Sequence, residues 1–173
     1  MKKQIITARL FIEQNMKPSD PTIEKNTFLF AWNPVKYEWR EIGERIAELR
    51  RGESVKEDWS CATKKVKPGD RAFLSVVGVE PRGIFASGYV ASELFIGENH
   101  RGKMANRVMI EFDVLLDPAR EPILTLDILN IGSLEKQLWT PQASGISIRS
   151  ELVQELEALW KDFLQTRNSQ KKF

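Results

Sequence analysis

The sequence predicts a single α+β domain built as a small barrel or curled sheet with flanking helices, and three observations carry this prediction. A chain of 173 residues with 42% hydrophobic side chains has the size and apolar content of one globular domain. Strand-like segments dominate its middle, most clearly residues 107–116, where Val108, Ile110 and Phe112 alternate with less apolar neighbours. Helical spacing occurs once near the start of these strands and once after them, which is typical of an α+β architecture.

The expected strands lie between turn signals. Residues 27–32 (TFLFAW) form an apolar run that ends at Asn33-Pro34. The turns Lys67–Asp70 and Pro81–Gly83 introduce the strands that follow them. We therefore expect strands at 27–32, 59–62, 71–77, 84–95 and 107–116, and a short strand or a helix lead-in at 123–126.

Two segments have the spacing of amphipathic helices. Residues from about 39 to 51 place Trp39, Ile42 and Ile46 on one face. Residues from about 150 to 165 do the same with Leu152 and Leu156. The two prolines of residues 17–21 have linker chemistry, since proline breaks regular pairing.

The cysteine and histidine counts exclude several kinds of site. Cys61 is the only cysteine, so the chain has no internal disulfide, and His100 is the only histidine. One histidine cannot supply a Cys/His zinc site or the HExxH motif, and a Ser-His-Asp arrangement would have to use His100. No GxGxxG or GxSxG motif occurs. We expect neither a metal nor a cofactor.

The compartment follows from the same residues. No apolar run approaches the roughly 18 residues that a membrane span needs. A single cysteine fits a reducing compartment. We expect a soluble, cytoplasmic protein that does not bind membranes. The formal net charge of +2 means that nucleic-acid binding would depend on local basic patches.

One segment imitates a phosphate-binding loop. Residues 97–103 match the spacing GxxxxGK, but Met104 follows where magnesium binding needs Ser or Thr, and the next segment has the pattern of a strand. These residues are expected to form a charged hairpin loop.

The five tryptophans divide into two groups. Trp39 and Trp160 have core-like spacing on the expected helices. Trp32, Trp59 and Trp139 lie at strand ends or in loops beside small polar residues. A tryptophan in such a context can stack on a planar ring while its neighbours hydrogen-bond the ring edge.

Basic residues gather near the same segments. Lysines follow Trp59 closely, and a second basic run begins at Arg101. Cations in loops around an aromatic site would bind phosphates and position a nucleic-acid strand. The candidate phosphate-binding residues are Lys64, Lys65, Lys67, Arg82, Arg101 and Lys103.

Four segments resemble a known family. FLFAWNP (28–34), WSCATKKVKPGDR (59–71), EPRGIFASGYV (80–90) and WTPQASGISI (139–148) are similar, in the same order, to an EVE-like domain of the PUA/YTH-like superfamily. More specifically, these segments resemble the version found at the N-terminus of bacterial HNH restriction endonucleases that attack modified DNA. The resemblance covers about residues 27–164.

The resemblance implies a PUA-like mixed β-barrel of five to six strands flanked by helices. It divides the chain into an N-terminal extension (1–26), an EVE-like domain (27–165) and a C-terminal tail (166–173). It further implies a non-catalytic reader that binds modified double-stranded DNA and cages a flipped 5-methylcytosine-type base, serving restriction of modified DNA. The base-binding residues implied by sequence context and resemblance are Trp32, Asn33, Trp59, Ser60, Cys61, Ser87, Trp139, Gln142 and Ser144.

The nuclease half of those fusion proteins is absent, which implies a stand-alone reader, a subunit that acts with a separate nuclease, or an excised fragment. Two alternatives stay open. The same fold could bind modified or single-stranded RNA, since related barrels do. The chain could also be an enzyme, as part of a modification-dependent endonuclease or as a hydrolase that uses Glu111, Asp113 or Cys61.

Overall fold

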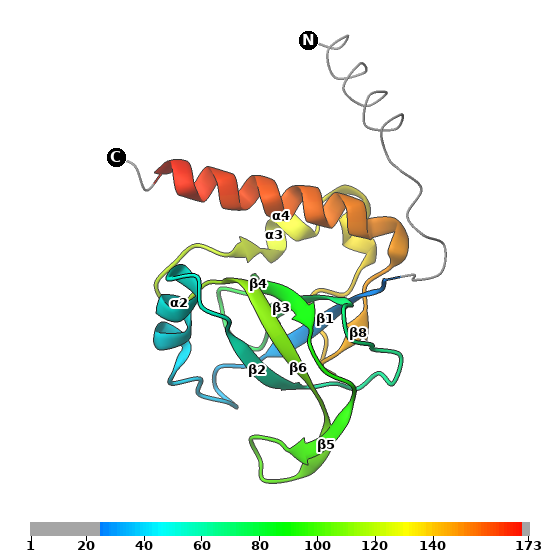
Figure 1. Cartoon of the computed structure of the whole chain (residues 1–173). Helices are drawn as coiled ribbons and strands as arrows, with labels where there is room; N and C mark the ends of the chain where they lie inside the picture. The colour runs from blue at the N-terminus through cyan, green and yellow to red at the C-terminus, as the bar shows by residue number, and fades with distance from the viewer. Residues whose placement is uncertain (1–24, 171–173) are drawn as a thin grey trace, which may run out of the picture.

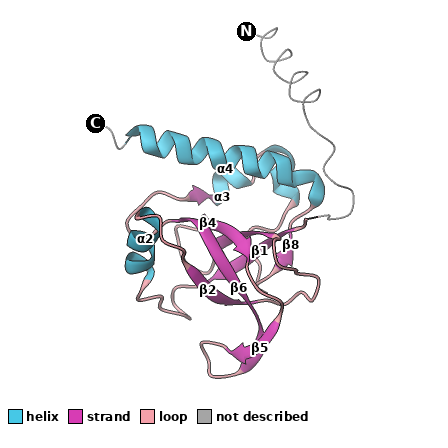
Figure 2. Ribbon diagram, in the orientation of Figure 1, coloured by secondary structure: helices cyan, strands magenta, loops and turns pink. Residues whose placement is uncertain are grey.

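The computed structural model describes residues 25–170, which fold around one curled sheet (Figure 1; Figure 2). Residues 1–24 of the expected extension and residues 171–173 of the expected tail lie outside the described residues. The elements are β1 (Thr27–Trp32), α2 (Ile42–Arg50), β2 (Lys56–Ser60), β3 (Arg71–Val76), β4 (Gly83–Val90), β5 (Phe95–Glu98), β6 (Met104–Leu115), β7 (Leu124–Thr125), α3 (Leu126–Leu129), the 3-10 helix η1 (Gly132–Lys136), β8 (Ile146–Ser147) and α4 (Ser150–Gln170).

The sheet is mixed. Its strands follow the order β2-β6-β4-β3-β1-β8, while β5 pairs with β6 and β7 pairs with β4. β1 and β3 run parallel, from Thr27 beside Arg71 to Trp32 beside Val76, and the other neighbours are antiparallel. Within residues 25–170, six strands have four or more residues, and β7 and β8 have two each. The predicted α+β class and curled, barrel-like mixed sheet are confirmed.

Two irregularities in the strand pairing coincide with the curl of the sheet. The register shifts between β3 and β4 at Leu74/Ser75, and between β4 and β6 at Ser87/Gly88. On β6 the second shift leaves Asp113 without a ladder partner, because Val114 lies opposite Ser87 and the next pair uses Phe112. A bulge of this kind bends a strand and changes which face its side chains occupy. The inward alternation of β6 therefore loses its phase after Phe112.

The helices cover the sheet as their apolar faces require. α4 lies across one side of the sheet, with α3 beneath it, and α2 packs at another edge (Figure 1). α4 buries Leu152, Leu156 and Trp160, while Trp39 is buried just before α2. The core positions predicted for the two helix tryptophans are confirmed.

Several element bounds differ from the prediction. β2 is Lys56–Ser60 rather than 59–62, and β6 begins at Met104 rather than 107. The strand expected at 84–95 is two strands, since the chain leaves the ladder after Val90 and Ser92 caps the break by accepting from Met109 N–H. α2 begins only at Ile42, and the residues before it form turns at 34–36 and 40–41. α4 continues to Gln170, where buried Arg167 pairs with Glu121 at 3.0 Å, so residues 166–170 are helical rather than tail.

Candidate nucleic-acid interface

A cleft of about 960 Å³ opens where β1 and β2 end. Its volume falls within the roughly 300–1,000 Å³ of ligand pockets. Its walls are the β1 end with the turn that follows, the end of β2, the β3–β4 loop, the tip of the β5–β6 hairpin and the loop 140–144. Segments far apart in sequence thus meet at one site.

The turn after β1 folds Tyr37 back over the cleft. The Asn33 carbonyl accepts the N–H groups of Lys36 (3.1 Å) and Tyr37 (3.0 Å), and Asn33 Oδ1 accepts the N–H of Val35 (3.1 Å). Asn followed by Pro favours such a turn, since the Asn side chain can hold the backbone two residues on. The Tyr37 carbonyl in turn accepts the indole N–H of Trp32 (2.9 Å).

A chain of rings runs from the core to the cleft. Trp32 meets Trp39 at a centroid distance of 5.8 Å, and Trp39 meets Trp59 at 5.3 Å. Tyr37 meets Trp59 edge-on at 6.2 Å and His100 at 5.8 Å. The contact between Tyr37 and His100 joins the turn after β1 to the hairpin tip.

The two cleft tryptophans are largely buried. Trp32 is 7% exposed and Trp59 is 6% exposed. The Trp59 indole N–H donates to the Ala31 carbonyl (3.0 Å), as that of Trp32 does to Tyr37, so neither has a donor left for a ligand. Both can offer ring surface only, and the more exposed rings of the site are Tyr37 and His100.

One cation of the cleft is held by the protein itself. Arg107 of β6 pairs with Asp58 of β2, and it also donates to Ser60 Oγ (3.0 Å) and to the Asp58 carbonyl (3.1 Å). These contacts fix the floor of the cleft. Ser60 accepts from Arg107, so its hydroxyl hydrogen is still able to donate.

The other cations give the rim a positive charge. Lys36 and Arg101 make no ion pair within residues 25–170, and Arg82 pairs only with exposed Glu80 (2.7 Å). Partial burial, together with the charges of Arg101, Arg107 and Lys36, lowers the pKa of His100. Burial and neighbouring carboxylates, with Glu57 first among them, raise the pKa of Tyr37. Both rings are therefore neutral near pH 7.

The loop 140–144 is held against β1 and β2. Ser144 Oγ accepts the Ala31 N–H (3.1 Å), and its carbonyl accepts the Ala62 N–H (2.8 Å). Gly145 has φ +85°, and a Cβ there would lie 2.9 Å from Cys61 Sγ. Glycine is thus needed both for its backbone conformation and for the close approach.

The cleft brings together eight of the residues predicted as binding groups. They come from five separate segments of the chain. They are Trp32, Asn33, Trp59, Ser60, Gln142 and Ser144 among the predicted base-binding residues, and Arg82 and Arg101 among the predicted phosphate-binding residues.

Two further predicted base-binding residues lie in the core. Cys61 is buried beneath the loop 140–145, its thiol contacts the Thr63 carbonyl (3.4 Å), and burial raises the pKa of the thiol. Trp139 is 2% exposed, and its indole N–H donates to the Leu134 carbonyl (2.9 Å). It lines a separate hollow of about 370 Å³ beside η1. Neither residue lines the cleft.

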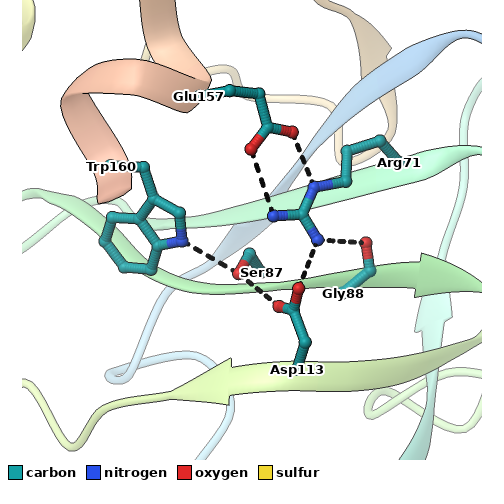
Figure 3. A network of polar contacts seen from close by, with 6 residues as sticks. All are labelled: Arg71, Ser87, Gly88, Asp113, Glu157 and Trp160. Carbon is teal, nitrogen blue, oxygen red and sulfur yellow. Dashed lines mark hydrogen bonds and ion pairs between the residues drawn. The ribbon is translucent and has the colours of Figure 1, made fainter. Parts of the chain in front are cut away.

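Ser87 lies under α4, away from the cleft (Figure 3). It is fully buried, donates to Asp113 and accepts the Trp160 indole N–H (2.9 Å). Arg71 completes this network, since it bonds Glu157 and Asp113, each at 2.7 Å. The network connects β3, β4 and β6 to α4, so Ser87 has a packing role here. Asp113 is committed to the same network.

Four predicted phosphate-binding lysines lie outside the cleft. Lys64, Lys65 and Lys67 are exposed in the β2–β3 loop, and Lys103 is exposed at the base of the hairpin turn. The turn itself is closed by hydrogen bonds between Asn99 and Lys103. The GxxxxGK imitation at 97–103 is thus a hairpin loop, as predicted.

Several cleft residues were not predicted from the sequence. Tyr37, Asp58 and His100 contribute rings and a carboxylate, and Lys36 adds a cation. A signal existed for Tyr37, since it is an aromatic residue at the end of the Asn33-Pro34 turn. The sequence held no such signal for His100, because only the pairing of β5 with β6 brings His100 to Tyr37.

No group of three or more His, Cys, Asp or Glu side chains between residues 25 and 170 is placed to hold a metal ion. None of the helices in that range combines the length and apolar character of a membrane span.

No protein-family model matches the chain, and no curated protein matches its sequence. Solved structures do match. A hypothetical protein from Leishmania major superposes with a TM-score of 0.58 at 12% identity, over 82% of this chain and 98% of that one. A Pseudomonas syringae protein gives 0.54 at 16% identity, over 77% and 98%. Human THYN1, solved in complex with 5-methylcytosine-containing DNA, gives 0.54 at 13% identity, over 78% and 97%.

These similarities lie at the level of the fold, since every identity is far below 25%. They cover most of residues 25–170 and nearly all of each matched chain. The chain therefore shares the fold of these structures, a mixed curled sheet with a few helices.

Proposed function

We propose that the protein is a non-catalytic reader of modified DNA, which holds a flipped 5-methylcytosine-type base in the cleft. The observation that carries the proposal is the cleft itself: a cavity of about 960 Å³ with aromatic walls and a cationic rim. Aromatic rings bind bases through their faces, while cations at a rim bind the phosphates on either side.

The structural comparison supports the nature of the ligand. Human THYN1, which shares this fold, was solved with 5-methylcytosine-containing DNA. Because fold does not imply function, the proposal depends on the residues of this chain's own cleft.

Different cleft residues would stack on the base and hydrogen-bond its edge. Tyr37 offers ring surface, to which Trp32 and Trp59 add the small exposed part of their rings, and stacking of a base on such a surface contributes about 1–3 kcal/mol. Hydrogen bonds to the base edge come from Gln142 and from the hydroxyl of Ser144. Stacking and edge hydrogen bonds together offset the few kcal/mol that unstacking costs.

Phosphate contacts come from Lys36, Arg82 and Arg101 at the rim. An added methyl group is recognised by apolar contact, which discriminates by about 1–3 kcal/mol. We therefore expect moderate selectivity for the modified base over cytosine, added to sequence-independent affinity for the backbone.

The test is a titration of labelled duplexes that differ at one cytosine, which is plain, 5-methylated or 5-hydroxymethylated. Fluorescence anisotropy at two salt concentrations is expected to show tighter binding to a modified duplex at both. Tyr37→Leu should remove this preference, whereas Tyr89→Leu, the same change at an exposed tyrosine that does not line the cleft, should keep it.

Other outcomes decide between the alternatives. Equal binding to all three duplexes contradicts the proposal, and tighter binding to the matching RNA assigns the cleft to RNA, where the 2′-hydroxyl adds contacts. Metal-dependent cleavage of methylated plasmid by the purified chain would assign it to nucleases. Service to restriction, with a separate nuclease partner, stays a prediction that plating of a phage with modified cytosines would measure.

A further inference from the structure

The β5–β6 hairpin (residues 95–107) projects beyond the main body of the sheet (Figure 1). In the part of the chain that the structure describes, β5 pairs only with β6, so the outer edge of the hairpin is uncovered. Its tip residues Glu98, Asn99, His100 and Arg101 form one wall of the cleft. Whatever occupies the cleft therefore lies beside this hairpin.

One face of the hairpin carries two apolar side chains that are exposed to solvent. Register places Ile96 opposite Asn106 and Glu98 opposite Met104, so all four share a face and Ile96 and Met104 are diagonal neighbours. Ile96 is 64% exposed and Met104 is 67% exposed. Two large apolar side chains exposed together on a projecting element mark a surface that meets a partner.

The charge beside this apolar pair favours a polyanion. Arg101 and Lys103 lie in the turn between the two strands, and both are exposed. Neither makes an ion pair within residues 25–170. Arg107, at the base of the hairpin, is neutralised by Asp58 and adds no charge there. Glu98 adds one exposed carboxylate to the same turn, so the two cations leave the tip with a net positive charge, and the apolar side chains lie behind it.

We propose that the hairpin enters a DNA duplex next to the cleft and places Ile96 and Met104 in the gap that the flipped base leaves. This inference rests on the proposed function. Apolar side chains that enter between base steps replace lost stacking and hold a duplex open, while flanking cations bind the phosphates. A single strand has no such gap, so the pair should contribute to duplex binding only.

The experiment compares the variant Ile96→Ser/Met104→Ser with wild type on one modified oligonucleotide, used both as a duplex and as a single strand. Both side chains are exposed, so the fold should tolerate the change. Leu138→Ser, 59% exposed beside the second hollow, is the matched control. The double variant should lose about tenfold or more of its affinity for the duplex, while its affinity for the single strand stays unchanged. 2-Aminopurine beside the modified cytosine should brighten with wild type and less with the variant.

The outcomes separate the two proposals. Equal duplex affinity of variant and wild type overturns the insertion and leaves the reader standing. An equal loss on duplex and single strand also overturns it, because the pair would then be a general contact. Wild type that ignores the modification overturns the reader and the insertion together. If sedimentation shows that the wild type is a dimer and the double variant is not, Ile96 and Met104 form a contact between two copies of the chain, and the insertion is overturned.

Discussion

At the scale of single residues, His100 gives the cleft a dependence on pH. Partial burial and the charges of Arg101, Arg107 and Lys36 lower its pKa, so it is neutral near pH 7. A bound phosphate favours the imidazolium form and raises that pKa, so proton uptake accompanies binding. DNA affinity is therefore expected to increase several-fold from about pH 7.5 to about pH 5.5 at constant salt.

The lowered pKa of His100 has the opposite effect on the stability of the free protein, which decreases as the pH falls. Because the pKa of His100 is lower folded than unfolded, its contribution to stability is present above the ordinary value of 6.5 and is lost as pH falls below it. His100→Gln is the control for both effects. If this variant keeps the full pH dependence of affinity, His100 does not face a phosphate.

At the scale of elements, the loop 140–145 depends on one glycine. Gly145→Ala places a Cβ 2.9 Å from Cys61 Sγ. The backbone there is left-handed, and a residue other than glycine adopts that conformation at a cost of about 1–2 kcal/mol. Gly132→Ala, at φ +64° with nothing within 4 Å, carries the conformational cost alone. Urea unfolding should show the larger loss of stability for Gly145→Ala.

Binding measurements test the role of the loop 140–145 independently of stability. Ser144 and Gln142 depend on its position, so Gly145→Ala should also weaken the preference for the modified base, whereas Gly132→Ala should not. Equal stabilities of the two variants would mean that the loop moves away from Cys61 without cost.

At the scale of the whole molecule, the small net charge predicts a limited dependence on salt. Four cations surround the cleft and the hairpin tip: Lys36, Arg82, Arg101 and Lys103. If each contacts one phosphate, log K should fall against log salt with a slope of about −3 to −4. Arg82→Gln/Arg101→Gln should reduce the magnitude of the slope by about 2.

The control is Arg120→Gln, because Arg120 is 84% exposed and does not line the cleft. It should leave the slope unchanged. Lys64→Gln/Lys65→Gln tests the predicted contribution of the β2–β3 loop, and a slope equal to that of wild type would exclude these lysines from the phosphate contacts.

Local patterns predicted most of the elements because each depends on neighbours in sequence. β1 occurs at Thr27–Trp32 as expected, since an apolar run bounded by Asn33-Pro34 has few other solutions. The strand expected at 84–95 was wrong, because its break depends on a hydrogen bond between Ser92 and Met109 of another strand. The extension of α4 to Gln170 likewise depends on a distant partner, Glu121, which pairs with Arg167.

By itself, then, the sequence determined the α+β class and the burial of Trp39 and Trp160, since periodicity encodes them. Sequence context and the family resemblance indicated several, though not all, of the segments that form the cleft. Only the tertiary structure decided which side chains face the cleft. Ser87 and Trp139 were predicted to bind the base, yet strand register places Ser87 under α4, and the path of the chain after η1 places Trp139 against that helix. His100 reaches Tyr37 only because β5 pairs with β6, a long-range contact that no local pattern contains.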